Sequence, residues 1–154
     1  MIKHVWSVLC QRSVVDSQTN NISIFDVFEA LQVDINPTPQ VKGKNNPEYN
    51  IPLQYQVVTF ISKEKEDMKD IKYSIRVTLE NSDGEKKILI NQNLTFLAHK
   101  KRMRSINQIQ GLPVSKSGVY HFIVELKENG GKFQKVADLP LEVKLNIKNL
   151  SNLN

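Results

Sequence analysis

The chain has 154 residues and a formal net charge of +5 at pH 7, and 40% of its residues are hydrophobic. This length fits a single domain, which at this size buries roughly 70% of the surface that its unfolded chain exposes. The composition therefore supplies a packed core and excludes global disorder. We expect one domain over residues 1–147 and a flexible tail over residues 148–154, which are polar and terminal.

The sequence predicts a cytoplasmic protein that does not enter a membrane. The N-terminal stretch lacks the apolar run and cleavage site of a signal peptide, and no run of about 18 apolar residues follows. Cys10 is the only cysteine, so no intrachain disulfide can form. A lone cysteine in an apolar strand is usually a small buried hydrophobe, which suits a reducing compartment.

The first part of the chain predicts strands separated by polar segments. Residues 3–12 alternate between apolar and polar side chains, as a half-buried strand does, and residues 16–21 are turn-like. Residues 22–35 fit both a helical and a strand pattern. Their β-branched content favours a strand with a bulge or break near residues 26–30.

A proline-rich segment over residues 36–52 is the most obvious loop. Connections longer than about 12–15 residues are uncommon in compact domains, and they are then usually functional or disordered. Residues 53–61 follow as a strand, and the charged stretch 63–70 is a solvated excursion. The loop is therefore a candidate binding element.

The second half predicts two hairpins and a strand between them. Residues 71–80 alternate cleanly, and residues 87–97 return after an Asp-Gly turn, where glycine supplies a positive φ at low cost. Residues 105–112 form a weaker strand. A second hairpin joins residues 118–128 to a last strand over residues 139–147.

The sequence around Gly118 and Tyr120 is typical of a tyrosine corner. A glycine lets the backbone turn, and alternate side chains from Tyr120 to Leu126 then point to one face of the strand. In antiparallel β-sandwiches, a tyrosine at this place lays its ring on the core and bonds its hydroxyl to backbone upstream. We assign Gly118 and Tyr120 a structural role.

These elements amount to about eight short strands, with no helical segment long enough to form a layer. One sheet with a wet face cannot bury the apolar stripes, so two sheets must pack face to face. We predict an all-β fold: a single two-layer antiparallel β-sandwich, immunoglobulin-like or a related Greek key. The Cys…Trp…Cys pattern of antibody domains is absent.

The order of these elements resembles an uncharacterised bacterial family of small β-sandwich domains of unknown function. The resemblance begins with VWSVLCQRSVVDSQTNN and NISIFDVFEALQVD. It continues through the proline-rich segment, the Asp83-Gly84 turn, the GVYHF step at Gly118 and the final strand. It implies the fold and a cytosolic location. It implies no activity, because the family offers no established site.

The sequence carries no assembled catalytic chemistry, and we expect neither an enzyme nor a cofactor. Nucleophilic catalysis needs a base within reach of the nucleophile, but His4, His99 and His121 are all distant from Cys10 in the sequence or unconstrained in space. Apolar surroundings raise the pKa of a thiol. The isolated histidines and sparse loop carboxylates do not form a metal-binding pattern.

The basic run over residues 99–104 contains four formal positive charges and no acid. Lysine and arginine at such a run can bind the phosphates of nucleic acid or another polyanion, and Lys42 and Lys44 would join them if the fold brings them close. A basic run at a strand start also protects a sheet edge from aggregation. No stacking-aromatic pattern accompanies it in the sequence. The candidate polyanion-binding residues are Lys100, Lys101, Arg102 and Arg104.

Two strands carry apolar residues on the face opposite their core stripe. Chain ends or the proline-rich segment could cover these residues, or they could form a protein–protein surface, since exposed apolar area usually marks association. Homodimerisation is the simplest version. The candidate interface residues are Val58, Phe60, Val119 and Ile123.

Our leading hypothesis is a non-enzymatic adaptor that binds protein, either another protein or a second copy of itself. The alternative is binding of nucleic acid or another polyanion through the basic run. The sequence leaves the partner, the oligomeric state and the strand order open.

Overall fold

The computed structural model describes residues 1–36, 48–64 and 69–148, which form an all-β fold without a helix. No helix in this part of the chain could therefore cross a bilayer. The strands are β1 (Ile2–Val15), β2 (Ile22–Val27), β3 (Ala30–Ile35), β4 (Tyr49–Lys63), β5 (Ile71–Glu80), β6 (Lys86–Phe96), β7 (Arg102–Val114), β8 (Gly118–Glu128) and β9 (Gln134–Ile147).

The all-β prediction is confirmed, with nine strands in the described residues where we expected about eight. Much of the proline-rich segment, including Lys42 and Lys44, lies outside the described residues, as do residues 149–154 of the predicted tail. Lys148, the first residue of that tail, still donates its backbone N–H to the carbonyl of Ile35 at 3.0 Å.

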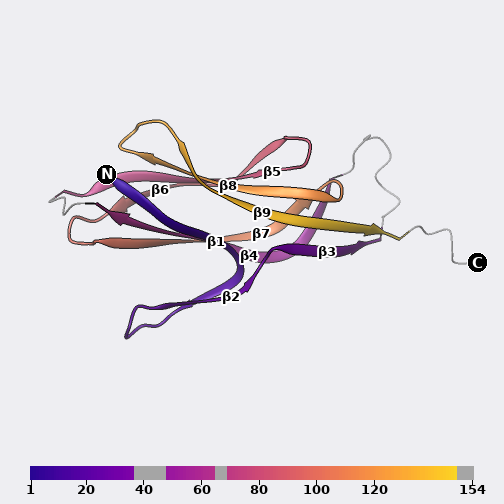
Figure 1. Cartoon of the computed structure of the whole chain (residues 1–154), viewed down its shortest axis with the longest axis horizontal. Helices are drawn as coiled ribbons and strands as arrows, with labels where there is room; N and C mark the ends of the chain where they lie inside the picture. The colour runs from indigo at the N-terminus through magenta and orange to yellow at the C-terminus, as the bar shows by residue number, and fades with distance from the viewer. Residues whose placement is uncertain (37–47, 65–68, 149–154) are drawn as a thin grey trace, which may run out of the picture.

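The strands form two curled sheets (Figure 1). The first sheet has the order β2-β1-β4-β7, and the second has the order β3-β9-β8-β5-β6. The expectation of an entirely antiparallel arrangement is wrong at one place, because β3 pairs with β9 in parallel.

The parallel pair arises because β2 and β3 are one run of chain that changes sheets. Asp26 adopts a left-handed conformation, with φ of 53°, and the run bends there. Phe28 then donates its N–H to Leu9 in the first sheet, and Glu29 accepts the N–H of Glu142 in the second. The break that the sequence predicted near residues 26–30 is confirmed, and it is the point where the chain crosses between the sheets.

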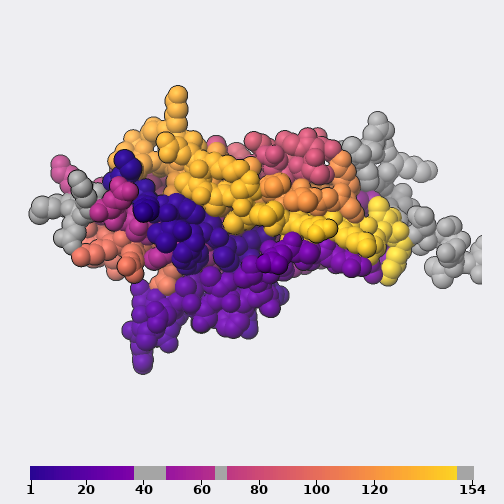
Figure 2. All heavy atoms as spheres, viewed as in Figure 1, coloured from indigo at the N-terminus to yellow at the C-terminus, as the bar shows by residue number. Residues whose placement is uncertain are grey.

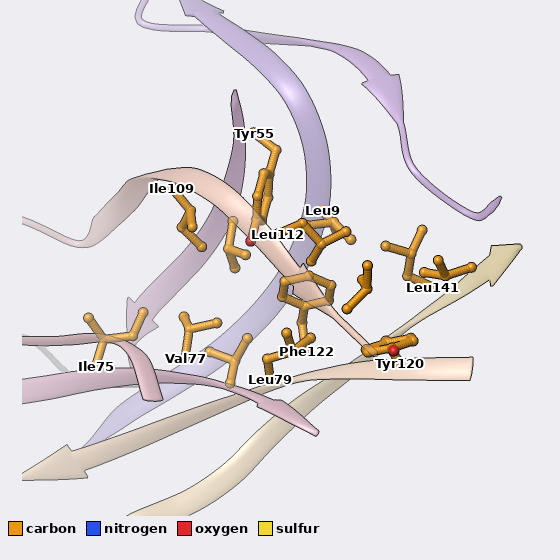
Figure 3. Packing of buried hydrophobic residues seen from close by; sticks show 14 residues of the cluster. Leu9, Tyr55, Ile75, Val77, Leu79, Ile109, Leu112, Tyr120, Phe122 and Leu141 are labelled. Atoms are coloured by element: carbon orange, nitrogen blue, oxygen red, sulfur yellow. The ribbon is translucent and has the colours of Figure 1, made fainter. Parts of the chain in front are cut away.

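The main core lies between the inner faces of the two sheets. Figure 3 shows Tyr55 of β4 pointing toward Phe122 of β8, and their ring centroids lie 5.7 Å apart at an interplanar angle of 78°. Both side chains are fully buried. Burying a large apolar side chain contributes about 1.5–3 kcal/mol, so this contact surface stabilises the two-layer arrangement.

A smaller cluster fills one end of the interior, around Ile61, Tyr73 and Phe96. A polar row crosses the inner face of the first sheet between the two clusters. Its members are Ser7, Thr59, Ser105 and Asn107. The Ser7 and Thr59 hydroxyls lie 3.0 Å apart, and Asn107 donates to the Ser105 hydroxyl at 3.0 Å. These bonds satisfy polar groups whose burial would otherwise cost stability.

Tyr120 ties the crossing from β7 to β8 to the core. Its ring is buried, and its hydroxyl donates to the carbonyl of Lys116 at 2.9 Å and accepts the N–H of Ser115 at 3.0 Å. Hydrogen bonds from a strand-start tyrosine to the preceding backbone define a tyrosine corner. Gly118 is required beside it, because a Cβ there would lie 2.9 Å from the Cβ of Ser82.

We expect Tyr120→Phe to lower the free energy of unfolding by about 1–2 kcal/mol, because the substitution leaves two backbone groups without a partner. Chemical denaturation measures this loss. Tyr73→Phe is the matched control: the Tyr73 hydroxyl is buried and makes no hydrogen bond to the described residues. Equal losses in the two variants would contradict the role of the Tyr120 hydroxyl.

Candidate functional site: the β1–β2 arm and its groove

Residues 10–27 form a hairpin that we call the arm. β1 pairs with β4 only as far as Cys10, and beyond it pairs with β2 alone. The Asp16 carboxylate closes the turn by accepting the N–H groups of Thr19 and Gln18, and these bonds hold the pKa of Asp16 below its usual value. The arm projects from the body of the protein (Figures 1 and 2).

Two contacts hold the arm against the outer face of the first sheet. The Nη2 atom of Arg104, in β7, donates to both the carbonyl and the side-chain oxygen of Asn20 at 2.6 Å. Nearer the body, the Ser13 hydroxyl donates to the Oε1 of Gln56 in β4 at 2.6 Å. Beyond Cys10, the arm is thus connected to β4 and β7 although it pairs with neither.

A groove of about 560 Å³ lies between the arm and the start of β7. Its apolar lining comes from Val15 of the arm, Phe60 of β4 and Ile106 of β7. Its polar lining comes from the arm turn and from the basic run, with Lys100, Arg102 and Arg104 on one side. The groove therefore combines apolar surface with positive charge.

Strand register brings aromatic and basic side chains together on this face. Trp6, Phe60 and Arg104 are register partners on β1, β4 and β7, and the rings of Trp6 and Phe60 lie 5.4 Å apart. The next row places Lys3 and Arg102 on either side of a serine. The sequence showed no aromatic pattern beside the basic run because these aromatics come from two other strands. Only the pairing register reveals them.

The four predicted polyanion-binding residues cluster where β7 begins. Lys100 and Lys101 lie in the exposed β6–β7 turn, and Arg102 is exposed at the strand start, whereas Arg104 is half-buried under the arm. Lys63 of β4 adds a further cation, because its Nζ donates to the carbonyl of Leu97 in the same turn at 2.9 Å.

The four predicted interface residues do not form one patch. Val58 and Phe60 lie on the outer face of the first sheet, and Val119 and Ile123 lie on the outer face of the second. Val58 is fully buried and Ile123 is only 9% exposed. Phe60 is half-buried and lines the groove, whereas Val119 is 43% exposed.

The two buried residues differ in their surroundings. Val58 lies between β1 and β7, with Val8 and Ile106 as its register partners. Ile123 is the register partner of Asp138, whose carboxylate is bonded to His121 at 2.7 Å and to Lys135 at 2.5 Å. Sequence periodicity identifies an outer face, but it does not show what lies over it.

Cys10 is fully buried at the base of the arm, and burial raises the pKa of its thiol. His4 donates or accepts one hydrogen bond, between its Nε2 and the Ser7 hydroxyl at 2.9 Å, and burial lowers the pKa of His4. No group of three histidine, cysteine or acidic residues in the described ranges is placed to hold a metal ion.

Comparisons with known proteins do not assign the chain to a family. No protein-family model and no curated protein matches it. Among solved structures, it is similar to Northeast Structural Genomics Consortium target SoR45, with 10% identity, coverage of 62% of this chain and 82% of that chain, and a TM-score of 0.31. It is also similar to the CooA pilin subunit from enterotoxigenic Escherichia coli, with 11% identity, coverage of 92% and 99%, and a TM-score of 0.24. These scores support no argument about function, and the family resemblance seen in the sequence stays a prediction.

We expect Arg104→Ala to loosen the arm, because the substitution removes both hydrogen bonds to Asn20. Backbone amides of β2 should then exchange with solvent several-fold faster, since a net loss of about 1 kcal/mol corresponds to roughly a fivefold change in opening. Native-state hydrogen exchange measures the effect. The Cys10 thiol should also react faster with a disulfide reagent.

Arg102→Ala is the control for this experiment. This substitution removes the same charge two residues away. The Arg102 side chain, however, makes no hydrogen bond within the described part of the chain. If the two variants exchange alike, Arg104 does not hold the arm.

Proposed function

We propose that this chain is a non-enzymatic binding protein that makes protein–protein contacts through the β1–β2 arm. The observation that carries the proposal is the exposure of large apolar side chains on the arm. Of eleven such side chains in the described residues, four belong to the arm. They are Val14, Val15, Phe25 and Val27. Exposed apolar area of this kind usually marks association.

The arm also offers backbone hydrogen-bonding groups. β2 lies at the edge of the first sheet, so one side of it is unpaired. An unpaired edge is a template on which an extended segment of another protein adds a strand. Phe25 and Val27 stand on that strand, 39% and 53% exposed, where they would contact such a segment.

The charge of the groove indicates which charge a partner would carry. The groove beside the arm is lined by Lys100, Arg102 and Arg104, and no acidic residue among those that the structure describes lines it. A partner segment with apolar residues and nearby carboxylates fits this combination. A second copy of the chain, with two β2 edges pairing about a twofold axis, is the simplest self-associating version.

The fold supports a relationship to immunoglobulin-like or other Greek-key sandwiches, which we include in the proposal. The tyrosine corner stands where the chain passes from the first sheet to the second, as it does in that class of fold. We also place the protein in the cytoplasm, where a buried reduced thiol such as that of Cys10 is stable.

The test compares Val27→Glu with Ile88→Glu in affinity capture from nuclease-treated cytosol and in light scattering. Both positions are similarly exposed, at 53% and 56%, but Ile88 lies on β6 of the other sheet. We expect the wild type and Ile88→Glu to retain a protein partner or to dimerise, and Val27→Glu to lose this, because a charge on the arm opposes apolar contact. Capture that both variants retain, or that both lose, would refute an interface on the arm.

A second candidate function is the binding of single-stranded nucleic acid or another polyanion. The observation that favours it is that Arg104 lies in the same cross-strand row as the Trp6–Phe60 aromatic pair. Lys3 and Arg102 lie in the next row. Stacking aromatics within a positively charged groove are the usual means of holding single strands.

Salt dependence distinguishes this candidate. If Lys3, Lys100, Arg102 and Arg104 each neutralise one phosphate, affinity for a labelled oligothymidine should fall roughly 50-fold between about 50 and 200 mM salt. Fluorescence polarisation measures this change. The double substitution Lys100→Glu and Arg102→Glu should abolish binding, and Lys86→Glu with Lys87→Glu, of equal charge change on β6, should not. Salt-insensitive binding would exclude this candidate.

A further inference from the structure

A polar groove of about 480 Å³ lies on the outer face of the second sheet and shares no described residue with the arm groove. Strand register brings its polar side chains together. Asn93 of β6, Ser74 of β5 and Lys127 of β8 form one cross-strand row, and Thr95 pairs with Lys72 in the next row. All five residues line the groove.

The turn from β8 to β9 supplies another part of the lining. Asn129 and Gly130 adopt left-handed conformations there, with φ of 46° and 75°. Asn129 donates its N–H to the carbonyl of Lys72 at 2.8 Å, which anchors the turn to β5 and places Gly130 at the groove. The remaining described lining residues are Tyr73 and Leu94.

The groove carries two positive charges without a neighbouring acid. Neither Lys72 nor Lys127 forms an ion pair with a described residue, and no acidic residue in the described ranges lines the groove. Arg76 on the same face differs, because the Glu125 carboxylate lies 2.6 Å from it. The Nζ of Lys127 lies 4.9 Å from the centroid of the Phe133 ring, a contact that positions the cation but adds no negative charge. The groove therefore favours an anionic ligand.

The two lysines are close enough to share one anionic group. Ser74 is the register partner of Lys127, and the bond from Asn129 to Lys72 continues that register, so Lys72 and Lys127 are diagonal neighbours. Such neighbours are about 7–8 Å apart, within reach of each other's long side chains. A phosphate ester suits this pair, because its charge at pH 7 is about −1.5 to −2 and its three oxygens accept charge-assisted hydrogen bonds.

The neutral side chains of the groove fit hydroxyl groups. The Ser74 hydroxyl donates to the Oδ1 of Asn93 at 2.7 Å, so the Nδ2 end of this amide is left for other partners. Asn93 and Thr95 are both exposed, and neither the Nδ2 of Asn93 nor the hydroxyl of Thr95 bonds to a described residue. An amide donor beside a hydroxyl, which both donates and accepts, matches the hydroxyls of a sugar.

We propose that this groove binds a phosphorylated sugar, with the phosphate on Lys72 and Lys127 and the sugar hydroxyls on Asn93 and Thr95. Its volume falls within the range of about 300–1,000 Å³ that is usual for small-molecule sites. The proposal does not depend on the arm or on the function proposed above.

The test compares glucose 6-phosphate with glucose and with inorganic phosphate. Each is titrated into the full chain and followed by amide and side-chain chemical shifts. We expect glucose 6-phosphate to shift the signals of Lys72, Asn93 and Lys127. Glucose should bind at least about 10-fold more weakly, because it makes no hydrogen bond between charged groups. Inorganic phosphate should bind roughly 2- to 12-fold more weakly for each neutral hydrogen bond that it lacks.

The double substitution Lys72→Gln and Lys127→Gln removes both charges and keeps long polar side chains. Both residues lie outside the core clusters, so this variant should fold as the wild type does. We expect its affinity for glucose 6-phosphate to fall at least about 10-fold. Lys86→Gln with Lys87→Gln is the matched control, because it changes the net charge equally on β6 outside the groove and should leave the affinity unchanged.

The proposal is overturned if glucose 6-phosphate shifts no groove signal of the wild type at millimolar concentration. It is also overturned if inorganic phosphate binds as tightly as glucose 6-phosphate, because the sugar would then make no contact. Equal losses in the two double variants would overturn it as well, since the charge of the whole protein, and not the groove, would then attract the ligand.

Discussion

Burial of two apolar stripes against each other is the constraint from which the other features of this protein follow. Tyr55 and Phe122 meet at the centre of that contact, and neither sheet could hide its stripe alone. The chain must therefore cross repeatedly between layers. Tyr120 fixes one crossing by bonding to the backbone before it, and the bend at Asp26 makes another.

The inner face of the first sheet is not uniformly apolar, and this divides the interior. The polar row from Ser7 to Asn107 separates the main core from the small cluster around Tyr73. A cavity of about 260 Å³ lined by Ile2, Tyr73 and Leu126 opens at that end.

The arm changes how the outer face of the first sheet can be used. Together with the start of β7 it forms a groove with an apolar lining and a basic side, while its own apolar residues face solvent. The outer face of the second sheet is different, because the ion pair of Arg76 with Glu125 and the bonds of Asp138 lie across it. We therefore propose the arm, rather than the second sheet, as the protein-binding surface.

The strands themselves were predictable because alternation of apolar and polar residues is a local property, recorded directly in the order of residues. The break near residues 26–30 was visible for the same reason. The parallel pairing of β3 with β9 was not, because a strand carries the same alternation whichever direction its neighbour runs.

The sequence by itself determined the all-β class, the position of most strands and the local signature at Gly118 and Tyr120. Only the tertiary structure decided that Trp6 and Phe60 lie beside Arg104, that Arg104 bonds to Asn20 of the arm, and that the hydroxyl of Tyr73 makes no hydrogen bond to the described residues. The physical reason is that these facts depend on register and on contacts between residues far apart in the chain, which no local pattern encodes.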